Sequence, residues 1–312
     1  MTIKNQPNNF RLHETILNSP HTLIAGTTGS GKSVLLNGIL LNLLKEKPDA
    51  GFVLIDTKRV ELRAFKDAPN CIYRAVEREE AAYALDMMTV GMETRFEKME
   101  ERNLKESDEF HIFIVIDELA DLLSAKDEIS KSCLESIVRI GRLGRAAHMH
   151  LLCCTQDPSR STLTAQLMQN FTTCIALRCK SDIESKQIIG IAGAEELPKH
   201  GKAILSDSFG YTYVNIPFTT DEDVNAVVSQ FPIKEASENK ESEPLMDEAP
   251  VAEYRPAPVA NEVSTEFSVF DFVGKALGYT VAASVVLLAF CGSIWLGLGA
   301  LGIACVFKHA MR

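Results

Sequence analysis

The sequence lacks an excess of positive charge. Its 32 Lys and Arg residues are outnumbered by 42 Asp and Glu, which gives a formal net charge of -10. Residues 221–312 contribute most of this imbalance, with 6 basic against 13 acidic residues, whereas residues 1–220 have 26 against 29. A nearly neutral first part argues against a protein that coats nucleic acid with a basic face, but it leaves room for a small basic patch lining a channel.

The eight cysteines include no C-x-x-C pair. Paired thiols at that spacing are typical of zinc sites and redox motifs. Cys153 and Cys154 instead lie inside an apolar run. We therefore interpret the cysteines as small buried residues in a reducing compartment, which excludes a zinc site and a disulfide framework.

A glycine-rich loop is the most specific motif present. Residues 26–33, GTTGSGKS, fit G-x-x-x-x-G-K-[ST] between an apolar run and a stretch with leucines at helical spacing. In such a loop, backbone N–H groups surround phosphate oxygens, the lysine reaches the β- and γ-phosphates and the serine ligates Mg²⁺. The sequence thus predicts ATP and Mg²⁺ as cofactors, with these nucleotide-binding residues: Gly26, Thr27, Thr28, Gly29, Ser30, Gly31, Lys32 and Ser33, the last also a metal ligand.

Two carboxylates follow a later apolar strand. In HIFIVIDELADLL the strand ends at Asp117 and Glu118. Behind a phosphate-binding loop this pair predicts a Walker B motif, in which Asp117 holds Mg²⁺ through water and Glu118 polarises the attacking water. Without that loop, helix capping would explain the same two residues.

The next strand and the helix before it carry further candidates. The buried run 149–154 delivers Gln156 at its carboxyl end, which suits a sensor of the γ-phosphate beside the Walker strands. The preceding helical stretch carries Arg139, Arg142 and Arg145, and an arginine that cannot reach its own nucleotide suits a finger inserted into a neighbouring subunit's site. For any one of them alone, a solvated helix face or a surface ion pair is an equal alternative.

Short apolar runs alternate with amphipathic helical stretches up to about residue 231. They lie at 22–25, 51–55, 112–116, 149–154, 174–177, 203–205 and 211–216. This alternation predicts an α/β fold, a P-loop NTPase core with a mostly parallel central sheet covered on both faces.

The rest of the chain has a different composition. Residues 232–275 are rich in Glu, Pro and Ser, which predicts a flexible acidic linker. Residues 276–307 contain no charged side chain and exceed the ~20 that a helix needs to cross a bilayer, so we expect a transmembrane segment, one tilted span or a hairpin, before a basic tail, 308–312. Because the N-terminus shows no signal segment, the ATPase part, 1–231, is expected on the cytoplasmic side of the cell membrane.

The ordered motifs resemble the motor domain of the FtsK/SpoIIIE family of DNA translocases, in the HerA-FtsK branch of P-loop ATPases. The similarity runs over roughly residues 12–230 and includes SPHTLIAGTTGSGKSVLLN, LIDTKRVELRAFKDAPN, IVIDELADLL and IVRIGRLGRAAHMHLLCCTQDPS. It implies a RecA-like core and a hexameric ring that pumps double-stranded DNA. It also implies that Arg145 is the trans-acting arginine and Gln156 the sensor, and it includes Lys58 and Glu61 in a family segment to which we assign no role.

Two departures from the family pattern bear on the cargo. Asp157 stands where the family has an arginine expected to face DNA, and Asp182 replaces a lysine, with Lys186 keeping its charge. Because phosphate contacts supply most nonspecific DNA affinity, this weakens the grip unless other cations compensate: Arg160, Arg178 or Lys180. A protein-secretion motor of the type VII kind therefore stays open as an alternative, as does a nucleotide-switched membrane scaffold, against which the Walker B pair and Arg145 count.

Overall fold

A computed structural model of the chain describes residues 4–5, 12, 15–16 and 18–230. The predicted linker (232–275), transmembrane segment (276–307) and basic tail (308–312) lie outside the described residues. Within the described part, no helix combines the length and the apolar composition that crossing a membrane requires.

The described residues form a central sheet of nine strands in the order β1-β9-β8-β7-β2-β6-β5-β3-β4. The strands are β1 Lys4–Asn5, β2 His21–Ala25, β3 Gly51–Ile55, β4 Cys71–Ala75, β5 Ile112–Ile116, β6 Met149–Thr155, β7 Thr173–Ala176, β8 Lys202–Asp207 and β9 Gly210–Asn215. Only β8 runs antiparallel to its neighbours β7 and β9, and all other pairs are parallel. The mostly parallel α/β sheet predicted from the sequence is therefore confirmed.

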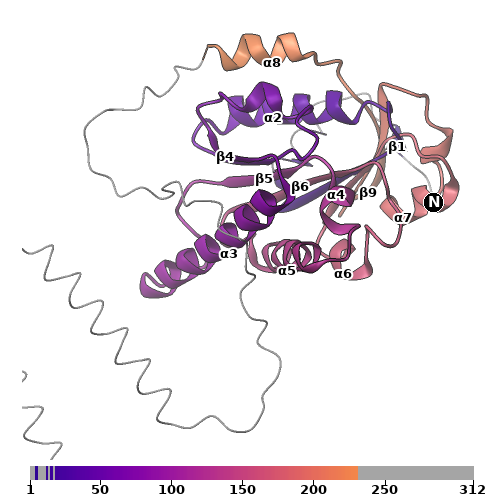
Figure 1. Ribbon diagram of the computed structural model, residues 1–312. Helices are drawn as coiled ribbons and strands as arrows, with labels where there is room; N and C mark the ends of the chain where they lie inside the picture. The colour runs from indigo at the N-terminus through magenta and orange to yellow at the C-terminus, as the bar shows by residue number, and fades with distance from the viewer. Residues whose placement is uncertain (1–3, 6–11, 13–14, 17, 231–312) are drawn as a thin grey trace, which may run out of the picture. The chain divides into compact units, whose positions relative to one another are not determined.

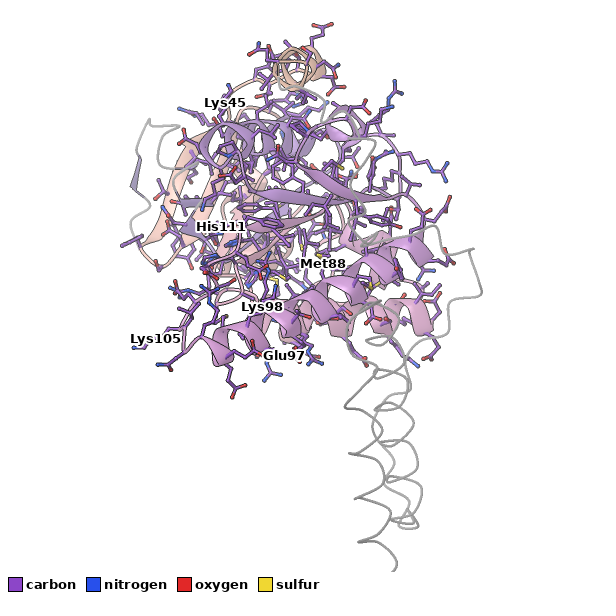
Figure 2. All side chains as sticks on the ribbon, turned by 90° about the vertical axis from the view of Figure 1, so that its left-hand side faces the viewer. Lys45, Met88, Glu97, Lys98, Lys105 and His111 are labelled. Atoms are coloured by element: carbon purple, nitrogen blue, oxygen red, sulfur yellow. The ribbon has the colours of Figure 1, made fainter. Side chains whose placement is uncertain are left out.

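Helices cover both faces of this sheet (Figure 1). They are α2 Lys32–Glu46, α3 Arg78–Glu101, α4 Leu119–Leu123, α5 Glu128–Leu143, α6 Ala165–Met168, α7 Asp182–Ile189 and α8 Asp221–Val228. Alternate strand residues point to opposite sides, so that Ile24 joins a core with α2 and α8, whereas Leu23 and Ala25 join a second core with α3 and α5. Figure 2 shows Met88 on the sheet side of α3 and Glu97 on the opposite side.

The strand β2 lies in the interior of the sheet. It pairs with β6 on one side and β7 on the other, and all five of its residues are buried. Because β2, β5 and β6 are parallel, their carboxyl ends meet at one edge of the sheet, where ligands bind in this kind of fold. We call this the carboxyl edge and the opposite side the amino edge.

The amino edge carries a row of hydrogen-bonded histidines, with His111 at the sheet margin above α3 (Figure 2). His111 Nδ1 lies 2.7 Å from His150 Nε2, Lys47 Nζ lies 3.2 Å from the other nitrogen of His111, and His150 Nδ1 lies 3.2 Å from the Pro20 carbonyl oxygen. An ammonium only donates and a carbonyl only accepts. Lys47 therefore donates to His111, the Nδ1–H of His111 donates to His150, and the Nδ1–H of His150 donates to the Pro20 carbonyl. Both rings are therefore neutral.

The cysteines within the described residues are free. Cys133, Cys153, Cys154, Cys174 and Cys179 are buried, as expected from their apolar surroundings, and Cys71 is half-buried. Burial raises the pKa of the Cys154 thiol to about 12, which keeps it protonated. These thiols serve as packing groups in the two cores.

Candidate nucleotide site

The loop between β2 and α2 has the backbone that a phosphate cradle needs. Gly29 and Gly31 adopt φ angles of 74° and 97°, in the left-handed region that favours glycine. A side chain at Gly26 would place its Cβ 2.6 Å from the Cβ of Leu177, which leaves room only for hydrogen. The three glycines predicted from the motif are therefore required by the conformation and by the packing.

Neighbouring strands fix this loop in place. The N–H of Gly26 donates to the Thr155 carbonyl at the end of β6 (3.3 Å), and the N–H of Thr27 donates to the Arg178 carbonyl after β7 (2.9 Å). Ser30, which is buried, closes a turn onto the Thr27 carbonyl at 3.0 Å. The loop is thus anchored on both sides before any nucleotide binds.

Lys32 and Asp117 form a buried ion pair at the start of α2. The lysine Nζ lies 2.6 Å from Asp117 Oδ1 and 2.8 Å from its carbonyl oxygen, and the side chains are only 4% and 1% exposed. Burial alone would lower the pKa of Lys32, but the negative groups around it and its hydrogen bond to Asp117 raise that pKa above its ordinary value. Lys32 therefore remains charged, as phosphate binding requires.

The donor set fits a magnesium ion. Asp117 Oδ2 is buried and has no hydrogen-bond partner among the described residues, and Ser33 lines the same cleft as Lys32. A hydrated Mg²⁺ held by one carboxylate and one hydroxyl would satisfy that oxygen. No group of three or more His, Cys, Asp or Glu side chains in the described residues could hold a metal by itself.

Glu118 is the N-cap of α4, and its side chain accepts several hydrogen bonds. Its Oε1 accepts from the Thr155 hydroxyl at 2.7 Å, from the Gln156 N–H at 3.0 Å and from the Ala120 N–H at 3.4 Å. Its Oε2 accepts from Lys58 at 3.2 Å. The residue is both the helix cap that a lone Asp-Glu predicts and a carboxylate at the edge of the nucleotide site.

Gln156 lies beside the glycine-rich loop. Its Oε1 accepts a hydrogen bond of 2.7 Å from the hydroxyl of Thr28. The structure thus brings together the sequence-predicted residues of this edge, from the ends of β2, β5 and β6. Their roles in binding and catalysis stay predictions.

Arg145 is not part of this group. It is exposed in the turn after α5 and lines a separate groove of about 720 Å³ with Pro20, Thr173 and Phe209. Because Pro20 precedes β2 and Thr173 begins β7, this groove lies at the amino edge, about 20 Å of strand away from the loop. The guanidinium makes no ion pair with a described residue, whereas Arg139 pairs with Glu93 at 2.8 Å.

The open cleft beside the loop has a volume of about 560 Å³, and the motif analysis missed one side of it. Besides the loop residues and Gln156, its walls include Val34, Glu61, His200, Gly201, Ile216 and Phe218. Since β8 is antiparallel, the amino end of β8 and the carboxyl end of β9 both reach the carboxyl edge, with His200 just before β8 and Phe218 just after β9. Phe218, which follows the predicted strand 211–216, was the one signal of this wall in the sequence. It could be interpreted only once the direction of that strand in the sheet was known.

The two acidic departures have local partners. Asp157 accepts from the Ser159 N–H at 3.2 Å and the Thr162 hydroxyl at 3.3 Å, so it stabilises its own turn. Asp182 pairs with Lys186 at 2.7 Å across one turn of α7, which neutralises the one retained cation of that motif. Arg160, Arg178 and Lys180 are exposed.

The fold and the site together define a P-loop ATPase with a RecA-like core. The chain belongs to the FtsK/SpoIIIE family, whose model matches residues 3–112 and 107–160, and the resemblance inferred from the motifs is confirmed. It is 35% identical over 234 residues to the DNA translocase FtsK of Sporosarcina ureae, which covers 67% of this chain and 30% of that protein. It is 36% identical over 230 residues to the DNA translocase SftA of Bacillus subtilis strain 168, covering 67% and 24%. The chain thus spans under a third of the length of these relatives.

Two solved structures share the fold. The pCW3 conjugation coupling protein TcpA, in a monomer form with ATPγS, has a TM-score of 0.60 at 25% identity and covers 68% of this chain and 65% of its own. The cytoplasmic domain of the Thermomonospora curvata type VII secretion ATPase EccC has a TM-score of 0.58 at 29% identity and covers 68% and 28%.

Proposed function

We propose that the chain is a motor that hydrolyses ATP and moves double-stranded DNA. The observation that carries the proposal is the meeting of Lys32, Asp117, Glu118 and Gln156 from three strand ends at one open cleft. The relatives named DNA translocases support DNA as the cargo.

Each residue of the cleft has a defined task in this proposal. Lys32 exchanges Asp117 for the β- and γ-phosphates, while the N–H groups of the loop bind the remaining phosphate oxygens. Ser33 and Asp117 would hold Mg²⁺, which neutralises phosphate charge when bound. Glu118 orients and polarises the attacking water, and Gln156 contacts the γ-phosphate end.

The apolar part of the cleft suits the base of the nucleotide. Val34, Ile216 and Phe218 line it, and the Phe218 ring is 81% exposed. An exposed ring at the rim of a pocket can stack on a purine without first displacing another side chain. This arrangement supports ATP as the substrate.

The proposal includes a ring of identical subunits, with six as the number that the family resemblance implies. Arg145 cannot reach the cleft of its own subunit, so it would serve the cleft of the next one. The segment 276–307 would anchor this ring to the cell membrane, with the ATPase part in the cytoplasm.

Hydrolysis is tested by Glu118→Gln. The substitution removes the charge that polarises water and keeps the phosphate cradle, so ATP should stay bound while turnover falls about a hundredfold or more. Steady-state turnover and binding of a labelled nucleotide measure the two effects. Turnover near the unmodified protein's would contradict the role of Glu118.

The cargo is tested by titrating long duplex DNA into the assembled protein at low salt. ATP turnover should rise several-fold, and the stimulation should fall steeply as salt is added, because it rests on phosphate contacts. Paired substitution of Arg160 and Lys180 by alanine should weaken the stimulation without changing basal turnover.

A second candidate is transport of protein, as in type VII secretion. The similarity to EccC at 29% identity favours it, as does the neutralised motif at Asp182 and Lys186. Absence of any DNA stimulation in an assembled, hydrolysing protein would decide for this candidate.

A further inference from the structure

The loop after β3 presents Lys58 on a fixed backbone. Asp56, which is fully buried, accepts from the N–H groups of Val60 (3.2 Å) and Leu62 (3.3 Å) and from Arg74 (2.9 Å). Arg59 adopts a left-handed φ of 59°, which completes the turn. The backbone is thus held at several points, and the lysine side chain, 40% exposed, is the part that can move.

Lys58 contacts two carboxylates, Glu118 at the N-cap of α4 and Asp121 within α4. Its Nζ lies 3.2 Å from Glu118 Oε2 and 3.9 Å from Asp121 Oδ2. Asp121 is held by the hydroxyl of Thr57 at 3.1 Å and is 34% exposed, whereas Glu118 is 3% exposed. One turn of helix separates the acids, so the ammonium can pass from one to the other by rotating its stem.

The hydrogen-bonding capacity of Glu118 is filled. A carboxylate accepts about four hydrogen bonds, and here a hydroxyl, two backbone N–H groups and Lys58 supply five contacts, because the Gln156 N–H lies near both oxygens. A water can reach the carboxylate only if one donor leaves. The hydroxyl of Thr155 is buried, and the two N–H groups belong to the backbone, in the first turn of α4 (Ala120) and directly after β6 (Gln156), which leaves Lys58 as the donor on a side chain that can move away.

We propose that Lys58 is a positioning residue that keeps Glu118 idle by occupying Oε2, and that it releases this oxygen to the attacking water by moving to Asp121. The inference rests on the proposed role of Glu118 in hydrolysis. It gives a task to a residue that the family resemblance marked without explaining. The resting enzyme is therefore restrained at the water-activating carboxylate, even though its phosphate cradle is complete.

Lys58→Met in the full-length chain tests this restraint. Methionine keeps the length of the stem and cannot donate, so basal kcat should rise roughly three- to tenfold at an unchanged KM for ATP. Lys58→Arg, which can still donate to a carboxylate, should return kcat to the low value. Lys66→Met removes an equivalent cation from the exposed pair with Asp67 and should change neither constant.

The substitution Asp121→Asn should change kcat in the opposite direction from Lys58→Met. It removes the charge that receives the lysine, so Lys58 should stay on Glu118 and kcat should fall at unchanged KM. A kcat in Lys58→Met equal to or below that of the unmodified protein would overturn the proposal, and so would an unchanged kcat in Asp121→Asn. Lys58→Met combined with Glu118→Gln separates the two claims, because turnover in that double variant would refute the role of Glu118 itself.

Discussion

At the carboxyl edge of the parallel strands, Lys32 and Asp117 keep a buried ion pair beside an open cleft, whereas at the amino edge His111 and His150 are packed as neutral rings. Both edges bury polar side chains of the same sheet. Keeping two charges out of water costs free energy that the ion pair only partly offsets, while the neutral histidines satisfy their nitrogens with donors and acceptors. The difference indicates that the carboxyl edge is built for an incoming charged ligand and the amino edge for packing.

Arg145 tests the conclusion that the amino edge serves only packing, because it is an exposed charge on that edge. If it serves a neighbouring subunit, Arg145→Ala should keep ATP binding and lose about a thousandfold in turnover. Mixing it with Lys32→Ala protein should restore partial turnover through interfaces that combine one intact cleft with one intact arginine. Arg142→Ala, an exposed change one turn earlier in α5, is the control and should stay active. Full turnover in Arg145→Ala would leave the amino edge without a catalytic part.

The buried histidines of the amino edge predict a dependence of folding stability on pH. Burial lowers the pKa of His21 to about 4, and burial with the neighbouring His111 and His21 lowers that of His150 to about 3. The unfolded chain, with an ordinary value near 6.5, binds more protons below that pH, so stability is full above about pH 6.5 and falls as the pH drops toward 4. At pH 5, His21 and His150 should each lower the free energy of unfolding by about 2 kcal/mol relative to its value at neutral pH.

Urea unfolding between pH 7 and pH 5 measures this loss. Glutamine at position 150 can donate to the Pro20 carbonyl and accept from His111 without titrating, so His150→Gln should flatten the dependence on pH by about one proton. An equally steep dependence in that variant would show that other groups cause it.

Phe218 tests whether the cleft at the carboxyl edge holds a base as well as phosphates. Phe218→Ala should weaken ATP binding about tenfold, because a base on an aromatic ring gains roughly 1–3 kcal/mol. Binding of tripolyphosphate, which has no base, should not change, and Phe218→Tyr should keep the affinity for ATP. Phe209→Ala, equally exposed at the other edge, is the matched control.

The smallest effect is expected at Asp157. Asp157→Arg adds a cation near the proposed DNA path, and one more phosphate contact should steepen the salt dependence of DNA binding by about one unit. Because the carboxylate also holds its turn through Ser159, Asp157→Ala separates loss of the turn from gain of charge. A salt dependence that is the same in both variants would place this residue away from DNA.

Much of the fold followed from local pattern. The runs at 51–55 and 112–116 coincide with β3 and β5, because a strand buried on both faces must be continuously apolar. The strand β4 was missed, since it lies at the sheet edge and contains half-buried Tyr73 and Arg74, which interrupt the apolar signal. The strand β1 has only two residues, too few for any periodicity.

Some contacts of the candidate site could likewise be predicted from the sequence, and others could not. Lys32 and Asp117 are adjacent in space because the loop that leads to Lys32 continues from β2 and Asp117 directly follows β5, and both strands end at the same edge of the sheet. The contact of Lys58 with Glu118 depends on a side-chain path across 60 residues of sequence, and the approach of Phe218 to the cleft depends on the reversed direction of β8. Neither contact can be predicted from the spacing of residues along the sequence.

The interior position of β2 also has a mechanical consequence. The strand is hydrogen-bonded along its length to parallel neighbours on both sides, and the phosphate-binding loop continues from its end. A pull along the strand axis loads both ladders in shear, so that many hydrogen bonds must yield at once instead of opening one after another. A strand held in this way can transmit a force generated at the loop into the rest of the sheet without sliding out of register.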